Sequence, residues 1–252
     1  MVDAGPYLPF CTPVNADTAS ILDFNDVAPG ATQAAFGQYG ATFSGGTYVY
    51  PASAGPADAG NVGLTSDFSG GNWHITGLVG TYSGFGLYLA CKSNVAAFTG
   101  LAFDVAGTFM ASDGSADAAG LAPRFSMGIS IPADELDSAH STNAPTWGTC
   151  TANCASPTRV VLFGSTNATV TTPWTSFAGG TPVNSVTPAE ILAIFFTLPW
   201  NGSTQYLVDL TIDNIRFTTE TGGIDASSPT DAPAETAAPA DAAADRAPDA
   251  SD

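Results

Sequence analysis

The sequence predicts an all-β domain, built as a sandwich or a barrel. Short runs rich in β-branched and aromatic residues recur along the chain, with turn residues between them. Leu is modest and Lys92 is the only lysine, whereas Gly, Ala, Ser and Thr are abundant, which disfavours a helical bundle. About ten strands at this spacing are typical of a sandwich or a barrel.

The predicted strands differ in how their apolar residues are arranged. Leu101, Phe103 and Val105 alternate with Asp104, which predicts a strand with one face toward the core. Residues 191–198 are apolar on both faces, which predicts a central, covered strand. In chain order the predicted strands are residues 19–24, 40–50, 72–80, 84–90, 100–107, 124–131, 158–163, 168–174, 191–198 and 205–217.

Two local features connect these strands. One helical turn is predicted at residues 187–191, where Thr187 caps the turn and Pro188 takes its first position. Trp174 and Phe177 stand three residues apart around a turn, and we expect them to pack in the core as a corner.

The chain divides into three regions. Residues 1–18 form an N-terminal arm, and residues 19–219 are long enough for one sizeable domain. Residues 220–252 are rich in Ala, Pro and Asp and have no aromatic residue, so they cannot bury enough surface to offset chain entropy. We therefore expect a disordered acidic tail.

The charge balance limits the partners. Five basic residues oppose twenty-three acidic ones, and a field of that sign repels phosphate backbones and anionic lipid surfaces. No apolar run is long enough to insert into a membrane. Nucleic acid and membrane are therefore not expected partners, whereas divalent cations and neutral ligands are. The sequence gives no indication of an oligomeric state.

Four cysteines point to an oxidising compartment, because their number is even and the chain carries little charge. We expect an exported protein, secreted or at the cell surface, whose leader is not visible at the start of this chain. Of three pairings, we favour Cys150 with Cys154 and Cys11 with Cys91. A metal pair at Cys150 and Cys154 is the alternative, but two histidines cannot readily complete a zinc site.

Motifs for catalysis are weak. No nucleophile elbow or complete dinucleotide fingerprint occurs. His74 and His140 are the only imidazoles, and we expect both to be ordinary strand or loop residues. Asp134, Glu135 and Asp137 are able to supply a carboxylate pair for glycoside hydrolysis. A solvated surface run is the simpler interpretation of these three acids.

Four stretches carry a family resemblance: "CKSNVAAFTGLAFDVAG", "GTCTANCASP", "VTTPWTSFAGG" with "VTPAEILAIFFTL", and "LTIDNIRF". Together they resemble secreted jelly-roll proteins related to the galactose-binding-like carbohydrate-binding modules, over most of residues 20 to 218. The resemblance implies a two-sheet antiparallel β-sandwich that binds sugar chains.

The resemblance also implies a structural Ca²⁺ shared by the first and last strands. Asp23, Asn25 and Asp213 are the matching positions, and their oxygens are the hard ligands that calcium prefers. Asn25 stands where a glutamate is commoner in such proteins. The alternative is that these side chains face solvent or cap turns.

Sugar binding requires exposed aromatic rings with hydrogen-bonding neighbours. Trp73, Tyr82, Trp147 and Trp200 are the candidates, because each lies in a polar or Gly-rich context. Trp147 is the foremost, since a neighbouring disulfide would reduce the ordering cost of its loop. The alternative for each of these rings is that it packs at the rim of the sandwich and binds no sugar.

These observations predict an exported, non-enzymatic β-sandwich that binds a polysaccharide or oligosaccharide. One alternative is a glycoside hydrolase or polysaccharide lyase on the same fold, although the basic residues that a lyase needs are scarce. The other is a structural or adhesive surface protein with the tail as its stalk.

Overall fold

The structure is a computed structural model that describes residues 14–28, 30–37, 43–51, 63–80, 82–112, 122–137, 148–200 and 204–219. The predicted tail at residues 220–252 lies outside this part of the chain, as do Cys11, His140 and Trp147.

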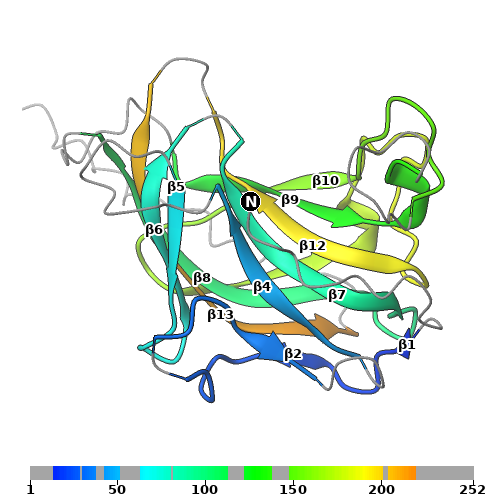
Figure 1. Ribbon diagram of the computed structural model, residues 1–252, viewed down its shortest axis with the longest axis horizontal. Helices are drawn as coiled ribbons and strands as arrows, with labels where there is room; N and C mark the ends of the chain where they lie inside the picture. The colour runs from blue at the N-terminus through cyan, green and yellow to red at the C-terminus, as the bar shows by residue number, and fades with distance from the viewer. Residues whose placement is uncertain are drawn as a thin grey trace, which may run out of the picture.

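The described residues form two β-sheets that pack face to face (Figure 1). All strand pairs are antiparallel except that of β1 with β7. This arrangement confirms the predicted all-β, two-sheet sandwich. The seven-stranded sheet has the order β10 (Thr158–Leu162), β9 (Arg124–Ser130), β12 (Ile191–Thr197), β7 (Gly84–Asn94), β4 (Gly45–Tyr50) and β3 (Ala35–Phe36), with β1 (Val14–Asn15) beside β7. The six-stranded sheet has the order β11 (Ala168–Pro173), β8 (Gly100–Ala111), β13 (Tyr206–Thr218), β6 (Trp73–Val79) and β5 (Gly63–Asp67), with β2 (Ser20–Leu22) beside β13.

Aromatic rings from both sheets fill the core. Strand alternation turns every second side chain inward, so Phe125 and Phe196 of the seven-stranded sheet contact Phe103 of β8. Phe196 lies 4.8 Å from Phe85, 5.0 Å from Phe125 and 5.7 Å from Phe103 between ring centroids. These contacts join the two layers and hold the backbone on which the outer side chains stand.

Strand β12 is central, as its sequence predicts, because it pairs with β9 on one side and β7 on the other. Its second face is less covered than expected: Ala193, Phe195 and Thr197 are only partly buried. The apolar outer position Phe195 therefore belongs to a surface of the sandwich.

Several short elements differ from the sequence expectations. Strand β5 was not expected, because its sequence GLTSD is short and polar. Strand β1 extends the sheet into the predicted arm. At residues 187–191 there is a single turn, in which the Glu190 N–H donates to the Thr187 carbonyl over 3.1 Å.

The expected corner is present. Trp174 and Phe177 are buried at a 3₁₀ turn, Trp174–Ser176, that follows β11. A second 3₁₀ turn, Pro132–Asp134, follows β9. Within the described ranges no helix is long and apolar enough to cross a membrane.

Candidate functional site

Four aromatic side chains share the outer face of the seven-stranded sheet. Tyr48 and Tyr50 come from β4, Tyr88 from β7 and Phe195 from β12, and each is partly buried. They occupy the strand positions opposite to the core residues, since the alternate residues Thr47, Leu87, Leu89, Ile194 and Phe196 are fully buried or nearly so. These four residues are termed the aromatic platform.

Glycines beside the rings let them lie low on the sheet. Tyr48 pairs across strands with Gly86, and a Cβ on Gly86 would be 2.6 Å from the Tyr48 hydroxyl and 2.8 Å from Cζ. Tyr50 covers Gly84, and Phe195 covers Gly128, in the same way. A side chain at any of these glycines would collide with the ring beside it. The rings therefore lean sideways across the neighbouring strand.

The two tyrosines of β4 lie side by side. Their ring centroids are 6.0 Å apart and their planes differ by 28°. This separation is close to the roughly 6.6 Å between residues i and i+2 of a strand, so the two rings follow the spacing of β4. The two rings thus form a continuous aromatic strip along β4.

Registry places aromatic residues and glycines alternately across the strands. Tyr48 of β4, Gly86 of β7, Phe195 of β12 and Gly128 of β9 form one row. Since strands are about 4.8 Å apart, the positions of Tyr48 and Phe195 are separated by about 10 Å. In the next row the Tyr50 hydroxyl lies 3.2 Å from the Thr197 hydroxyl. Burial raises the pKa of Tyr50, so the phenol stays protonated.

A hollow of about 430 Å³ continues this face beyond Thr197. Tyr82 and Trp200 contribute aromatic surface, and Val160 contributes apolar surface. Tyr82 is 84% exposed and Val160 is 60% exposed. Arg124 and Ser126 of β9 add polar groups to the lining. The hollow thus combines open rings with a few hydrogen-bonding side chains.

Backbone hydrogen bonds tie the two loops of the hollow together. The Leu198 N–H donates to the Ser83 carbonyl over 2.9 Å, which joins the chain after β12 to the chain before β7. The Tyr206 hydroxyl donates to the Pro199 carbonyl over 2.7 Å. Tyr206 is fully buried, and this burial raises its pKa. Tyr82 and Trp200 are therefore carried on anchored loops.

The four predicted aromatic candidates have three different outcomes. Tyr82 and Trp200 line the same hollow, although they lie far apart in the sequence. Trp147 lies outside the described residues. The prediction that Trp73 is an exposed ring is wrong, because Trp73 is fully buried. Its indole N–H donates to the Ser66 hydroxyl over 2.9 Å, and Phe85 packs edge-on against it at 5.3 Å.

Sequence reasoning missed the platform residues. The signal was present in "TYVY", where Tyr48 and Tyr50 alternate with an inward Val49, and in "GFGLY", where glycines alternate with core residues. The pairing of these two strands was needed to show that the glycines lie beneath the rings.

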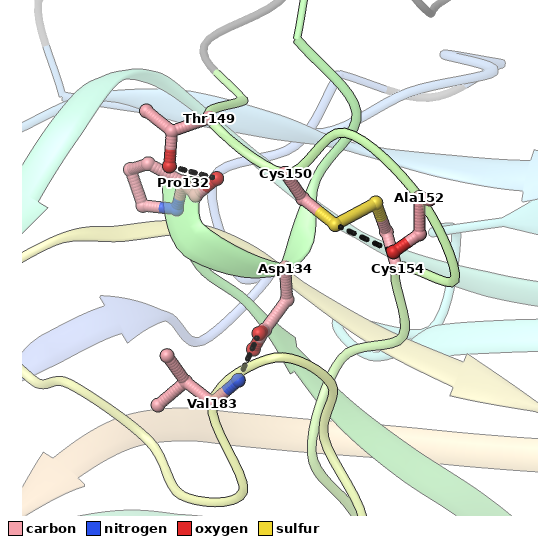
Figure 2. Close-up of a disulfide and its surroundings, with 7 residues drawn as sticks. All are labelled: Pro132, Asp134, Thr149, Cys150, Ala152, Cys154 and Val183. Carbon is pink, nitrogen blue, oxygen red and sulfur yellow. Dashed lines mark hydrogen bonds between the residues drawn. A yellow bond between two sulfur atoms is a disulfide. The ribbon is translucent and has the colours of Figure 1, made fainter.

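Two side chains of the acidic cluster, Asp134 and Glu135, have different hydrogen-bond partners. Asp134 is 3% exposed, so the expectation of a solvated run is wrong for this residue. Figure 2 shows its side chain directed toward the backbone of Val183, whose N–H donates to Oδ1 over 3.1 Å. Glu135 instead accepts a bond of 2.6 Å from the Ser130 hydroxyl. Burial raises the pKa of Asp134, and its Oδ2 has no partner in the described structure.

His74 lies on β6, on the outer face of the other sheet. Its Nε2 is 2.9 Å from Oδ1 of Asp209, and both side chains are substantially exposed. An exposed pair of this kind contributes about 1 kcal/mol or less to stability. His74 is distant in the fold from the aromatic platform, because the two lie on opposite faces of the sandwich.

Two of the three residues predicted to bind calcium, Asp23 and Asp213, lie close enough for their charges to interact. Asp213 of β13 pairs in register with Asp104 of β8, and Asp23 follows the neighbouring strand β2. Burial raises the pKa of Asp213, and the carboxylates of Asp104 and Asp23 raise it further, whereas a backbone bond from Asn214 lowers it. Asn25 is exposed and its N–H donates to Asp23 over 3.3 Å.

Hard oxygen donors of this kind fit the chemistry of Ca²⁺. In the described chain, however, no three His, Cys, Asp or Glu side chains are close enough together to hold a metal ion. Calcium at Asp23, Asn25 and Asp213 therefore stays a proposal.

The predicted short disulfide is confirmed. Cys150 and Cys154 are bonded, with their Cα atoms 6.0 Å apart, next to the 3₁₀ turn after β9 (Figure 2). The Thr149 hydroxyl donates to the Pro132 carbonyl over 3.3 Å and the Cys150 N–H donates to the Glu135 carbonyl over 3.0 Å. Cys91 is also disulfide-bonded, and its predicted partner Cys11 lies outside the described residues.

No protein-family model and no curated protein matches this sequence. Solved structures do. The family 11 carbohydrate-binding module of a cellulosomal cellulase of Clostridium thermocellum is 15% identical, with a TM-score of 0.43, over 83% of this chain and 99% of that one. The same family's module from Clostridium thermocellum in complex with a β-1,3-1,4-mixed-linked tetrasaccharide is 16% identical, with a TM-score of 0.42, over 82% of this chain and 99% of that one. A family 29 carbohydrate-binding module is 10% identical, with a TM-score of 0.35, over 80% of this chain and 87% of that one.

Proposed function

We propose that this protein binds polysaccharide without cleaving it, on the outer face of the seven-stranded sheet. The observation that supports the proposal best is the aromatic platform: Tyr48, Tyr50 and Phe195 lie over glycines on a rigid sheet. Flat, fixed ring faces are suited to stack against the apolar faces of pyranose rings, while nearby polar groups bond the hydroxyls.

The arrangement favours an extended sugar chain over a single sugar. The platform lies on the surface of a sheet, so both ends of a bound chain are able to continue past it. The two rows place ring faces both along β4 and across to β12, and the hollow with Tyr82 and Trp200 extends this surface. A chain therefore contacts several rings at once.

Rigidity supports useful affinity in such a shallow site. The platform residues stand on strands, and the loops of the hollow are joined by the bond from Leu198 to Ser83. Little conformational entropy is then lost on binding. We expect a free energy of about 4 to 8 kcal/mol, which corresponds to millimolar to micromolar dissociation constants.

The proposal that the protein does not cleave its ligand is supported by the scarcity of acidic residues on the binding face. The described strands of the seven-stranded sheet contain neither Asp nor Glu. Glu135, beside this face, accepts a hydrogen bond of 2.6 Å from the Ser130 hydroxyl. Glycoside hydrolysis requires two carboxyl groups across the scissile bond. Export remains part of the proposal, and the Cys150–Cys154 disulfide supports it.

The direct test is retention on insoluble polysaccharides and affinity electrophoresis in soluble glycans, including mixed-linked β-glucan. Tyr48→Ala and Phe195→Ala should each weaken binding about ten-fold or more, since a contact worth 1.4 kcal/mol is a factor of ten. Thr211→Ala, on the outer face of the six-stranded sheet, is the control and should bind as the parent does.

Two results would contradict the proposal. If the unaltered protein binds no glycan in a broad panel, carbohydrate binding is wrong. If it binds but the two platform variants bind equally well, the site is elsewhere. Release of reducing sugar from the same polysaccharides would show that the protein is a hydrolase, and the non-catalytic proposal would then be wrong.

A further inference from the structure

Charge is divided unequally between the two sheets. The described strands of the seven-stranded sheet hold Lys92, Arg124 and Arg159 and no acidic residue. In the described strands of the six-stranded sheet, Arg216 is the only lysine or arginine. The same strands hold four aspartates: Asp67, Asp104, Asp209 and Asp213. In a chain with a net charge of −18, three of the five basic residues thus lie in the sheet that carries the aromatic platform.

These three cations are not equivalent. Arg159 is half-buried and its Nη1 donates to the Ser176 hydroxyl over 2.9 Å, so its guanidinium is engaged within the fold. Arg124 is exposed and lines the hollow together with Tyr82 and Trp200. In the described structure no carboxylate pairs with Arg124. A guanidinium is therefore available beside two aromatic rings.

We propose that Arg124 makes the hollow a subsite for a pyranose carrying an anionic substituent, a carboxylate or a sulfate ester. This inference rests on the proposed function and names the class of sugar that the face selects. The guanidinium presents paired N–H donors whose geometry matches an oxyanion, and such charge-assisted bonds are stronger than bonds to neutral hydroxyls. Tyr82 and Trp200 supply the surface for the ring of the same sugar.

The overall negative charge of the protein does not prevent this recognition. At physiological ionic strength, charges farther away than about 8 Å are largely screened. The four strand aspartates belong to the other sheet, across the full thickness of the sandwich, which is about 10 Å between sheets. Among the described residues that line the hollow, Arg124 is the only charged one.

The test uses one sugar backbone in three forms. Binding of the full chain to mixed-linked β-glucan is compared with binding to the same polymer oxidised at C6 to the carboxylate and to the polymer sulfated at C6. We expect the anionic forms to bind about ten-fold more tightly than the neutral form at low salt. Added NaCl should weaken binding of the anionic forms and leave the neutral form unchanged.

Arg124→Gln should remove the preference for the anionic forms, and Arg124→Lys should restore part of it. Arg216→Gln makes the same change in net charge on the other sheet and should keep the preference. Preference for either anionic form supports the proposal, and their ratio distinguishes carboxylate from sulfate.

Equal binding of all three forms, or a preference that survives Arg124→Gln, would overturn this inference. Binding of the neutral polymer that depends on Tyr48 and Phe195 would at the same time leave the proposed function intact. Binding of none of the three forms, nor of any other glycan in the panel, would overturn both.

Discussion

Tryptophan has different roles at different positions of this protein. Trp73 and His74 are consecutive on β6, so their side chains face opposite sides of the sheet. The Trp73 ring points into the core, where it packs against Phe24, Phe68 and Phe85. Trp200 follows β12 and lines an open hollow. Both tryptophans have polar neighbours in the sequence, so those neighbours do not distinguish the two cases. What distinguishes them is whether the position faces the core or the surface in the alternation of the strand.

Truncation should separate these roles. Trp73→Ala should lower the free energy of unfolding by about 3 to 5 kcal/mol, because it leaves a large cavity in the core. Trp200→Ala should leave the unfolding free energy nearly unchanged and weaken glycan binding. Urea unfolding and affinity electrophoresis of both variants provide the measurement. A large loss of stability in Trp200→Ala would show that this ring serves packing instead.

Asp213 should make stability depend on pH. Burial and the nearby carboxylates of Asp104 and Asp23 raise its pKa in the folded state above 3.8. The folded state then binds the proton more tightly than the unfolded state does, so the stability from this group is present below about pH 4. It is lost as the pH rises through the raised pKa.

With a chelator present, Asp213→Asn should therefore raise the melting temperature at pH 7 by about 2 °C and change it little at pH 4. The exposed residue Asp17 provides a control, since Asp17→Asn should change neither value. A lower melting temperature for Asp213→Asn at pH 7 without calcium would show that the carboxylate is stabilised by groups other than a metal ion.

At the scale of elements, the turn after β9 is held from several sides. The Cys150–Cys154 loop bonds to Pro132 and Glu135, and Asp134 bonds to Val183 in the loop before β12. These contacts fix a segment that is next to the outer edge of the seven-stranded sheet, since Glu135 also bonds to Ser130 of β9.

Removing the disulfide should have a small, measurable effect. In the chain-entropy description, a closed loop of this length stabilises the fold by about 2 kcal/mol. The double variant Cys150→Ser, Cys154→Ser should lose that amount or less in urea unfolding and should keep its affinity for glycan. Loss of affinity comparable to that of Tyr48→Ala would show that the loop takes part in binding.

At the scale of the whole molecule, the first and last strands of the six-stranded sheet lie side by side. β2 pairs with β13, which brings Asp23 near Asp213 and Asp104. A cation bound at the predicted ligands Asp23, Asn25 and Asp213 would join the start of the domain to its last strand and offset the repulsion between the two carboxylates.

Calcium should then stabilise the protein as a whole. We expect millimolar CaCl₂ to raise the melting temperature and excess chelator to lower it, and the difference should disappear in Asp213→Asn. Magnesium is the matched control, because its smaller ion demands a stricter geometry. Identical melting curves with calcium and with chelator would remove the proposed site.

Much of the fold follows from local pattern. The alternation in residues 100–107 and 205–217 is enough to predict β8 and β13, and the apolar run at 191–198 is enough to predict a central strand. Strand β5 was not predicted, because its five residues have little apolar character and carry no such pattern. Its place in the sheet depends on pairing with β6. The Cys150–Cys154 pair was predictable because the cysteines are close in sequence.

The site depended on information that no single segment contains. The sequence by itself determined that strands would alternate inward and outward, that cysteines would pair and that negative charge would predominate. Only the tertiary structure decided that Gly84, Gly86 and Gly128 lie under rings from neighbouring strands, that Tyr82 and Trp200 line one hollow, and that the strand aspartates and the platform lie on opposite sheets. The physical reason is that strand pairing and registry are long-range choices, made by burying the core, whereas the pattern along one strand fixes only which side chains share its face.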